Sequence, residues 1–330
     1  LAFLPALVLL GLLILLAGGW SALALKVSGP PALREALAAG AALVTLVAVV
    51  ALFVRRWRWR MVAVFGAVFA ATLAWYFSLA PSNERDWVTE NARLAHAKVE
   101  GDIVTVHNVR NFDYRSENDF TPAYYDKRYD LAKLQGVDLV ATYWMGPAVA
   151  HIMLSFEFAG GDHLAVSIET RKEKGESYST VSGFFREYEL YYVVADERDL
   201  IRVRTNYRKD PPEQVYVYRL NGTPEAARSV FMNYIEAINE LKARPSFYNS
   251  LSTNCTTTIW MHSQVNPGHV PFSWKILASG YVPQYLFEQG RLADRGLPFD
   301  ELQRQSLVNA RGQQADQAAD FSRRIRQIPR

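Results

Sequence analysis

The sequence contains a single cysteine, Cys255, in 330 residues. One thiol excludes an intramolecular disulfide, so any folded domain must be held together by its hydrophobic core. No histidine and cysteine residues have the spacing of metal ligands, and no glycine-rich phosphate-binding loop is present. The sequence therefore predicts neither a metal site nor another cofactor.

The sequence also has little net charge, +3 at pH 7. Part of the basic excess lies in residues 55–60, Arg-Arg-Trp-Arg-Trp-Arg, a short loop between two apolar runs. In this position, a basic loop with tryptophans is typical of a topology signal that anchors at lipid headgroups, and not of a nucleic-acid site. We therefore expect no nucleic-acid partner.

Three long apolar runs lie near the start of the sequence, at residues 1–25, 36–54 and 61–79. Each is close to the roughly 20 residues that span a bilayer, and the first lacks the basic n-region of a signal peptide. The positive-inside rule places the 55–60 loop in the cytoplasm, so the 27–34 loop and everything after Pro81 lie outside. We therefore expect a three-helix membrane anchor over residues 1–80 and an extracytoplasmic domain over residues 81–330.

The outer domain is predicted to contain strands first and helices last. Its apolar segments predict strands at residues 101–109, 137–143, 151–158, 163–171, 188–194, 200–203 and 214–220. Thr223 as the N-cap, Pro224 as the first helical residue and apolar residues at helical spacing predict a helix that ends before Pro245. The acidic segment 196–199 is interpreted as a solvated turn. The predicted fold class is α+β with an antiparallel sheet.

Cys255 lies where a polar loop, Thr253-Asn254, gives way to a short apolar stretch that predicts a helix. Unpaired N–H groups and the helix dipole at such a position stabilise a thiolate over a thiol, as a nucleophile requires. The alternative is a small buried hydrophobic residue, which is the usual role of a free cysteine. We expect Cys255 to be the nucleophile of an active site.

The predicted hairpin around Gly160-Gly161 supplies a base for that thiol. A three-residue turn pairs His151 with Glu169 on one polar face, whereas a turn one residue longer sets Thr170 opposite His151. In the first register, Glu169 fixes the tautomer of His151 while His151 takes the thiol proton, which is the arrangement of nucleophile, base and orienting group. We expect Cys255, His151 and Glu169 to be catalytic.

Each of these residues also has a simpler interpretation. A histidine such as His151 on the polar side of a strand is most often a solvated surface group, and Glu169 can form a cross-strand ion pair with Arg171 that contributes little if exposed. His107 is a rival base on another strand. His262 follows the cysteine by two helical turns, so it lies roughly 10 Å along the axis and is a poor base for the thiol.

The order of these features resembles a known fold and a known family. A strand histidine, a hairpin, a helix and an Asn-Cys pair that opens a second helix are similar to the permuted papain-like fold of the lecithin retinol acyltransferase group. Five segments together resemble the Lnb N-terminal periplasmic domain family: HNVRNFDY (107–114), SFEF (155–158), SIETRKEKGESY (167–178), RPSFYN (244–249) and NCTT (254–257). The resemblance implies a permuted papain-like domain on the periplasmic side of a bacterial inner membrane, with Cys255 and His151 at the positions of the family's cysteine and histidine.

The same resemblance implies a thiol acyltransferase linked to N-acylation of bacterial lipoproteins. The expected partners are a membrane phospholipid as acyl donor and a lipoprotein amine as acceptor. Family members that are lipoprotein N-acyltransferases carry membrane helices after this domain, whereas the apolar runs here precede it, so the substrate stays open. The alternatives are a periplasmic papain-like peptidase or amidase that acts on peptidoglycan or peptides, and a non-catalytic lipoprotein binder.

Several polar groups are candidates to assist this reaction. The backbone N–H groups of Cys255 and Thr256, with Asn254, are expected to stabilise a tetrahedral oxyanion. Five further residues are candidates to line the site or to bind a phosphate headgroup: Asn108, Arg110, Asn111, Tyr114 and Arg171. Arginines near a hairpin are as often structural clamps. The polar, arginine-rich tail, residues 301–330, is expected to pack on the domain or to touch headgroups.

Overall fold

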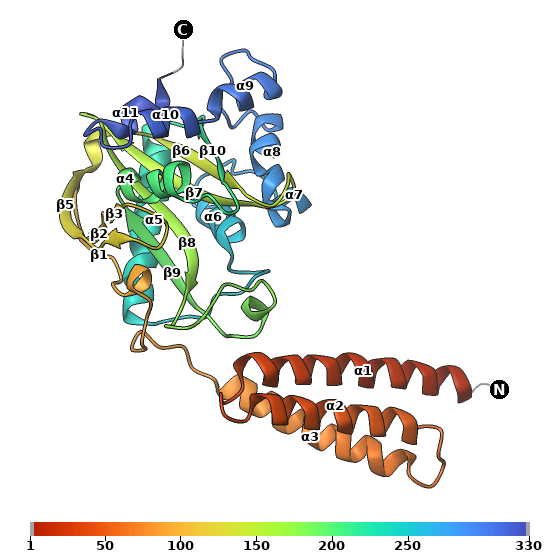
Figure 1. Cartoon of the computed structure of the whole chain (residues 1–330). Helices are drawn as coiled ribbons and strands as arrows, with labels where there is room; N and C mark the ends of the chain where they lie inside the picture. Colours follow the sequence, from red (N-terminus) through yellow and green to blue (C-terminus); the bar gives the residue numbers. More distant parts are fainter. Residues whose placement is uncertain (1–2, 328–330) are drawn as a thin grey trace. The chain divides into compact units, whose positions relative to one another are not determined.

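The structure of the protein, a computed structural model, describes residues 3–327 (Figure 1). The chain forms two compact units. The first contains the apolar N-terminal helices up to Ser82 together with two short segments, Ser177–Glu189 and Phe247–Asn249. The second contains the remaining residues, which form a sheet covered by helices.

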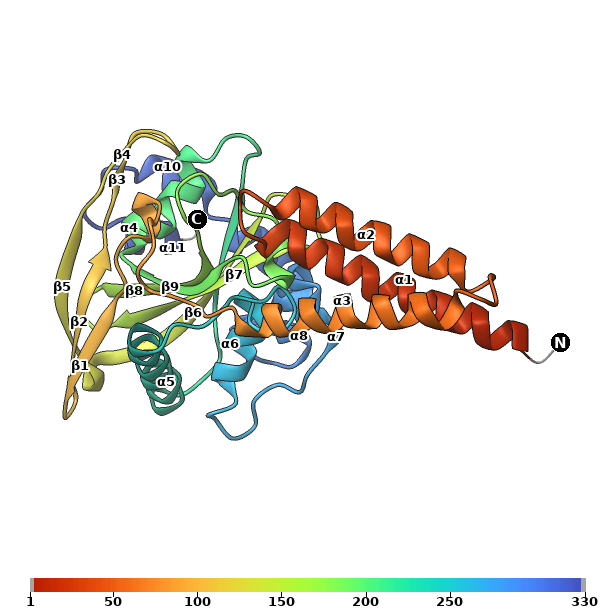
Figure 2. The ribbon, with the colours of Figure 1, turned by 90° about the horizontal axis from the view of Figure 1, so that it is seen from below.

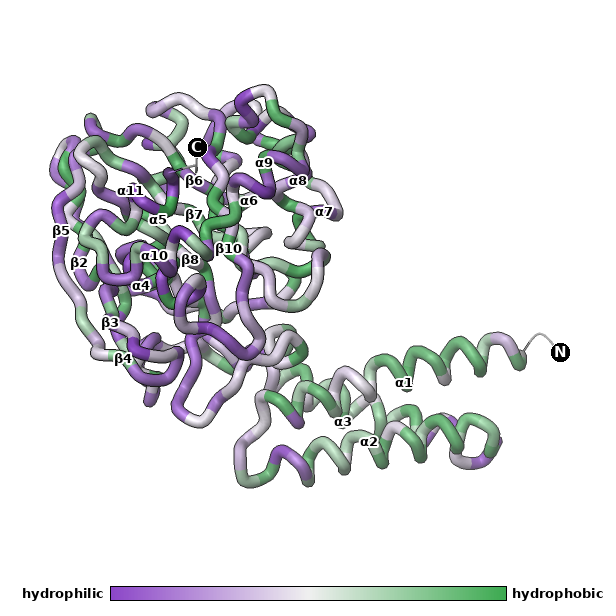
Figure 3. Tube along the Cα trace, turned by 45° about the horizontal axis from the view of Figure 1, so that its top comes forward, coloured by the Kyte–Doolittle hydropathy of each residue, from purple (hydrophilic) through white to green (hydrophobic). Residues whose placement is uncertain are grey.

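Three apolar helices make up most of the first unit: α1 (Phe3–Ser28), α2 (Arg34–Ala51) and α3 (Arg58–Ser78). All three are long and apolar enough to cross a membrane, and the tube in Figure 3 is mostly green along them. Ile14, Leu52 and Phe65 pack between the helices, whereas Leu9 and Leu16 are 60% and 72% exposed. Such exposed apolar side chains are stable in lipid and costly in water. The three predicted spans are confirmed.

The segment Ser177–Glu189 packs on the ends of α1 and α3 within the first unit. The Arg186 guanidinium donates to the Tyr76 carbonyl (3.1 Å) and lies 4.8 Å from the centre of the Tyr76 ring. The Ser28 hydroxyl donates to the Phe185 carbonyl. These ends of α1 and α3 therefore contact a segment that follows Pro81 in the sequence. Residues after Pro81 are predicted to lie outside the membrane, so this contact is expected if both helix ends face outward.

The second unit is built on one eight-stranded sheet, in the order β1-β2-β9-β8-β7-β6-β10 with β5 paired to β2. Its strands are β1 (His96–Glu100), β2 (Ile103–Arg110), β5 (Tyr124–Asp130), β6 (Leu134–Tyr143), β7 (Ala150–Phe158), β8 (Asp162–Arg171), β9 (Glu189–Ala195) and β10 (Gln214–Arg219). A short pair, β3 (Asp113–Tyr114) and β4 (Phe120–Thr121), lies apart. β2 and β9 are parallel, so the sheet is mixed rather than wholly antiparallel.

Helices cover both faces of this sheet (Figure 2). One face carries α5 (Pro224–Ala243) and α6 (Cys255–Ser263), and the other carries α4 (Glu197–Leu200), α10 (Asn309–Gln314) and α11 (Phe321–Arg326). Three more helices lie between α6 and α10 in the chain: α7 (Trp274–Leu277), α8 (Val282–Glu288) and α9 (Phe299–Ser306). The predicted α+β class is confirmed.

Helix α5 forms where the sequence predicts it. The Thr223 side chain accepts a hydrogen bond from the Ala226 N–H (3.2 Å), and Pro224 occupies the first turn, where its missing N–H has no helical partner to lose. On the apolar side of α5, the Phe231 ring lies 5.1 Å from the ring of Phe156 on β7. Helix α5 therefore packs on the face of the sheet to which Phe156, in the first strand of the predicted hairpin, points.

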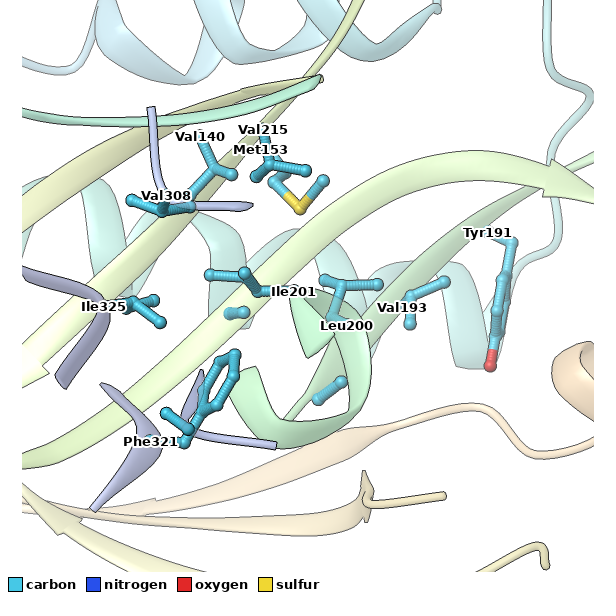
Figure 4. Packing of buried hydrophobic residues seen from close by; sticks show 13 residues of the cluster. Val140, Met153, Tyr191, Val193, Leu200, Ile201, Val215, Val308, Phe321 and Ile325 are labelled. Carbon is cyan, nitrogen blue, oxygen red and sulfur yellow. The ribbon is translucent and has the colours of Figure 1, made fainter. Parts of the chain in front are cut away.

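The opposite face of the sheet packs against α4, α10 and α11 (Figure 4). Met153 of β7, Ile201 beside α4, and Phe321 and Ile325 of α11 are completely buried in one cluster. The arginine-rich tail therefore packs on the domain, one of its two expected roles. The face of the hairpin that carries His151, expected to be polar and open, is largely covered as a result.

Residues 196–203 differ from the prediction. The segment 200–203, predicted as a strand, instead ends α4 and enters a π-helix, η4 (Val203–Tyr207). The Asp196 side chain accepts a hydrogen bond from the Arg198 N–H (2.9 Å) and caps α4. The 196–199 segment is not a solvated turn, because the carboxylates of α4 lie inside the domain.

The carboxylates of Glu197 and Asp199 can be buried because arginine side chains pair with them. Asp199 accepts two hydrogen bonds from Arg110 (2.8 and 2.9 Å). Glu197 accepts from Arg326 of α11 (2.6 and 2.8 Å) and from Ser155 of β7 (2.5 Å). A buried carboxylate is tolerated when it is paired and hydrogen-bonded. All of these partners are distant in the sequence, so the local pattern does not reveal them.

Replacing Arg326 with methionine is expected to destabilise the domain by about 3–5 kcal/mol, because it leaves Glu197 buried without its counter-ion. The measurement is the free energy of unfolding in urea, followed by tryptophan fluorescence of the chain in mild detergent. Arg324→Met is the matched control, since Arg324 pairs with Asp320 at the surface and such pairs contribute about 0–1 kcal/mol. Equal losses in the two variants would contradict the assignment.

Candidate active site

Cys255 is the first residue of α6, and Asn254 caps this helix. The Asn254 side-chain oxygen accepts hydrogen bonds from the N–H groups of Thr256 and Thr257 (both 2.9 Å). The Thr257 hydroxyl in turn accepts from the Asn254 N–H (3.1 Å), which completes a capping box. This local sequence makes the helix begin at the cysteine and places the thiol at the positive end of the helix dipole.

His151 lies near the start of β7, and the hairpin has the register predicted from a three-residue turn. Phe158 is opposite Asp162 and Met153 is opposite Ser167, so the same register, continued by two residues, aligns His151 with Glu169. Gly160 and Gly161 have φ angles of 96° and 88°, which only glycine adopts readily. The alternative register with Thr170 opposite His151 is excluded.

A serine connects the histidine to the glutamate. Nε2 of His151 lies 2.6 Å from the Ser167 hydroxyl, which donates to Oε1 of Glu169 (2.8 Å). The direct distance from Nε2 to the same carboxylate oxygen is 3.5 Å. Because the Ser167 hydrogen points to Glu169, its oxygen accepts the Nε2–H of His151, and Nδ1 takes no part in this contact. Ser167 is absent from the sequence prediction, although it shares the predicted polar face.

Cys255 and His151 lie close enough to shift each other's pKa. Burial alone would raise the pKa of the Cys255 thiol, but the charge and hydrogen bond of His151, with the N–H groups of Ile152 and Thr256, lower it. Burial alone would lower the pKa of His151, but Cys255 and the hydrogen bond of Glu169 raise it to about 9. Both shifts favour a thiolate beside an imidazolium at neutral pH.

Glu169 is held as a carboxylate by its neighbours. Burial would raise its pKa, but the hydrogen bond and charge of His151, together with Arg204 and Arg110, hold the pKa well below its usual range. Arg204 lies in η4, is almost completely buried, and reaches both Glu169 (3.3 Å) and Glu213 (3.2 Å). The sequence offers no signal for Arg204, which directly follows the predicted strand 200–203.

The structure gives the predicted site-lining arginines other partners. Arg110 forms the buried pair with Asp199 and reaches the site only through its effect on the pKa of Glu169. Arg171 donates to the Asn91 carbonyl (3.0 Å), and its guanidinium lies 4.2 Å from the centre of the Trp87 ring. Both arginines are structural clamps, the alternative that the sequence leaves open.

The other polar candidates are likewise held by loop contacts. The Asn108 side chain donates to the Leu94 carbonyl (3.1 Å), and the Asn111 N–H donates to the Ala123 carbonyl (2.9 Å). The Tyr114 hydroxyl approaches Asp199 at 3.5 Å. The amide NH₂ of Asn254 donates to the Ser250 carbonyl (2.8 Å), so this side chain serves the helix cap rather than an oxyanion.

The rival histidines have their own partners. Nδ1 of His107 lies 2.7 Å from the Asp126 carboxylate. His107 is on β2, and two strands, β9 and β8, lie between β2 and β7 in the sheet. His262 lies between the Tyr192 hydroxyl (2.8 Å) and the Asn233 side chain (2.6 Å), and burial lowers its pKa to about 4. Neither is placed to serve as a base for the thiol. Among residues 3–327, no three His, Cys, Asp or Glu side chains are arranged to hold a metal ion.

A cavity of about 620 Å³ is lined by the residues that follow His151 and Cys255 in the sequence. These residues are Ile152 and Thr256, whose N–H groups also help to lower the pKa of Cys255. Farther along, the wall is mainly apolar, with Ile259, Trp260, Ile276 and Val282 among its residues. This volume lies within the roughly 300–1,000 Å³ of typical small-molecule sites, so the cavity is large enough for an extended apolar group.

Replacing Ser167 with alanine is expected to lower kcat/KM about tenfold, because one buried hydrogen bond contributes about 0.5–1.5 kcal/mol. The variant also lowers the pKa of His151, so the alkaline limb of the pH–rate profile moves to lower pH. Ser155→Ala is the matched control, since Ser155 is equally buried on the same face but donates to Glu197. A profile that moves equally in both variants would contradict this role for Ser167.

Residues 120–280 match the family described as Lnb N-terminal periplasmic domain. This range contains His151, Ser167, Glu169, Arg204 and Cys255. The family resemblance of the sequence is confirmed, and with three apolar helices it is consistent with an inner-membrane protein that has a periplasmic domain. No curated protein and no solved structure matches the chain, so the permuted papain-like fold stays a prediction.

Proposed function

We propose that this chain, whose residues 120–280 belong to the Lnb N-terminal periplasmic domain family, is a membrane-anchored thiol acyltransferase. It moves an acyl chain from a phospholipid, through a thioester on Cys255, to the amino terminus of a bacterial lipoprotein. The observation that carries the proposal is the Cys255–His151 pair, whose sequence neighbours Ile152 and Thr256 line a mainly apolar cavity of about 620 Å³. A thiolate supplies the nucleophile, and the cavity suits an acyl chain.

In the first step, the Cys255 thiolate attacks the acyl carbonyl and forms a C–S bond. The ester C–O bond breaks, and the imidazolium of His151 gives its proton to the departing lysolipid oxygen. In the second step, the amine attacks the thioester while neutral His151 takes its proton. The C–S bond breaks, and the thiolate–imidazolium pair is restored, so protons balance over the cycle.

Backbone N–H groups supply the oxyanion site of this mechanism. The N–H of Cys255 is at the first position of α6, where helix geometry provides no partner. The N–H of Ile152, one residue after His151, lies close enough to the sulfur to lower the pKa of Cys255. The Thr256 N–H is shared with the Asn254 cap, so the Ile152 N–H replaces it as the second donor.

Labelling with a radioactive phospholipid tests the proposal. The purified chain is expected to form a label on Cys255 that hydroxylamine releases, and to pass it to a synthetic lipopeptide with a free amino terminus. Absence of label on the wild type, combined with cleavage of a peptide or of peptidoglycan fragments, would replace acyl transfer with amidase activity. Full cellular function of both Cys255→Ser and His151→Ala would instead establish a non-catalytic binder.

Blocking the cavity is expected to discriminate between acyl chains. Ala226 of α5 lines the cavity, so Ala226→Trp excludes several methylene groups. At about 0.8 kcal/mol per methylene, the loss of three to four lowers kcat/KM for a long-chain ester about a hundredfold, while a short-chain ester reacts normally. The measurement compares both esters in detergent. Ala243→Trp, at the exposed end of the same helix, is the control. Equal loss for both esters would contradict an acyl-chain cavity.

A further inference from the structure

A second cavity, of about 150 Å³, lies between the sheet and the C-terminal tail, apart from the Cys255 site. Four arginines line it: Arg219 of β10, Arg295 in the loop before α9, Arg311 of α10 and Arg326 of α11. Among the described residues that line it, Asp138 is the one acid. A space equal to about five water molecules holds a small polar group and is too small for an acyl chain.

Two of the four arginines are neutralised by carboxylates. Arg219 pairs with Asp138 (2.9 Å) and with Glu157. Arg326 pairs with Asp138 (2.7 Å) and Glu197 (2.6 Å). These pairs hold β10, β6 and α11 together, and they leave no carboxylate of this group for the other two arginines.

Arg311 is a partly buried cation whose hydrogen bonds, among the described residues, all go to carbonyl groups. It donates to the carbonyls of Gln327 (3.0 Å), Gln305 (2.8 Å) and Leu307 (2.8 Å). These three bonds use three of its five N–H donors and do not neutralise its charge. Burial lowers the pKa of Arg311, as expected for a cation without a nearby carboxylate.

Arg295 completes the wall from the solvent side. It is exposed and forms no ion pair with any of the residues that the structure describes. The neighbouring ion pair on α9, between Arg304 and Glu301, shows that acidic partners are present on this side of the domain but do not approach Arg295. Arg295 and Arg311 therefore line a common small space, and neither has a carboxylate partner among the described residues.

We propose that this cavity, which we call the arginine pocket and define by Arg219, Arg295, Arg311 and Arg326, binds a phosphate group. A planar guanidinium matches the geometry of phosphate oxygens and binds them through paired hydrogen bonds. The negative charge of the phosphate balances the charges of Arg295 and Arg311, which no described carboxylate neutralises. The size of a phosphate group also suits the pocket. The phosphate belongs either to a lipid headgroup or to a soluble phosphate ester.

Calorimetric titration of the full chain in nonionic detergent with inorganic phosphate tests the pocket. We expect saturable binding that weakens about tenfold in Arg295→Gln and at least a hundredfold in Arg295→Glu. Arg295 has no ion-pair partner between residues 3 and 327, so both variants are expected to fold, which their thermal unfolding checks. Arg304→Gln is the matched control and binds as the wild type does. Absence of saturable binding by the wild type, or equal affinity of Arg295→Glu, overturns the proposal.

Nanodiscs of phosphatidylglycerol and of phosphatidylcholine distinguish the two sources of phosphate. If a headgroup occupies the pocket, phosphatidylglycerol weakens the binding of inorganic phosphate at least tenfold relative to phosphatidylcholine, and Arg295→Gln removes the difference. If a soluble ester is the ligand, both nanodiscs give the same affinity. Cys255→Ser is expected to bind phosphate as the wild type does, so this proposal and the proposed acyl transfer fail independently.

Discussion

Replacing Cys255 with serine is expected to abolish the thioester and to lower kcat/KM for acyl transfer at least about 10⁴-fold. His151 lowers the pKa of the Cys255 thiol and so favours the thiolate, whereas a serine hydroxyl stays protonated. The helix cap is made by Asn254 and the threonines that follow, so the substitution leaves α6 in place. Transfer of labelled acyl chain to a lipopeptide measures the loss.

Two further measurements make this result specific to the thiol. Met261→Leu, on the same helix and at its exposed surface, is expected to retain full activity. The melting temperature of Cys255→Ser should equal that of the wild type, since serine is close to cysteine in shape. A labelled, hydroxylamine-sensitive intermediate in Cys255→Ser would place the nucleophile at another residue.

Replacing His151 with glutamine is expected to lower kcat/KM about 10³-fold, because the variant loses both the charge that stabilises the thiolate and the group that transfers protons. The pKa of Cys255 should rise toward its ordinary value. The rate of alkylation by iodoacetamide, measured against pH, reports this shift directly. His107→Gln, in which the lost partner is Asp126, should leave both activity and alkylation unchanged.

The pH dependence of the wild type follows from the same pair. The active ion pair is lost as the pH falls through the lowered pKa of Cys255, and again as it rises through the pKa of His151, about 9. The two groups titrate as a unit, so activity should form a plateau across neutral pH with two limbs. An activity that rises continuously to the ordinary pKa of a thiol, in the wild type, would contradict a preformed ion pair.

The hairpin was accessible to sequence analysis because its determinants are local. Two consecutive glycines permit the positive φ angles of a three-residue turn, and that turn alone sets which residue faces His151. The start of α6 is equally local, since Asn254 and Thr257 form the capping box within four residues. In both places, backbone geometry and short hydrogen bonds decide the outcome.

Other parts of the site depend on contacts between distant segments. Arg204 reaches Glu169 across 35 residues, and it does so because α4 and η4 replace the predicted strand. Glu197 of the same segment is buried only because Arg326 reaches it across 129 residues. A charged segment has the local signature of a solvated turn, and only a distant counter-ion changes its environment.

The sequence by itself determined the three apolar spans, the hairpin register, the capped helix at Cys255 and the family of residues 120–280. These depend on composition and on neighbours within a few residues. Only the tertiary structure decided that Ser167 links His151 to Glu169, that Arg110 and Arg171 are clamps, and that a mainly apolar cavity is lined by the residues next to His151 and Cys255. Each of these depends on packing between elements far apart in the chain, which no local pattern records.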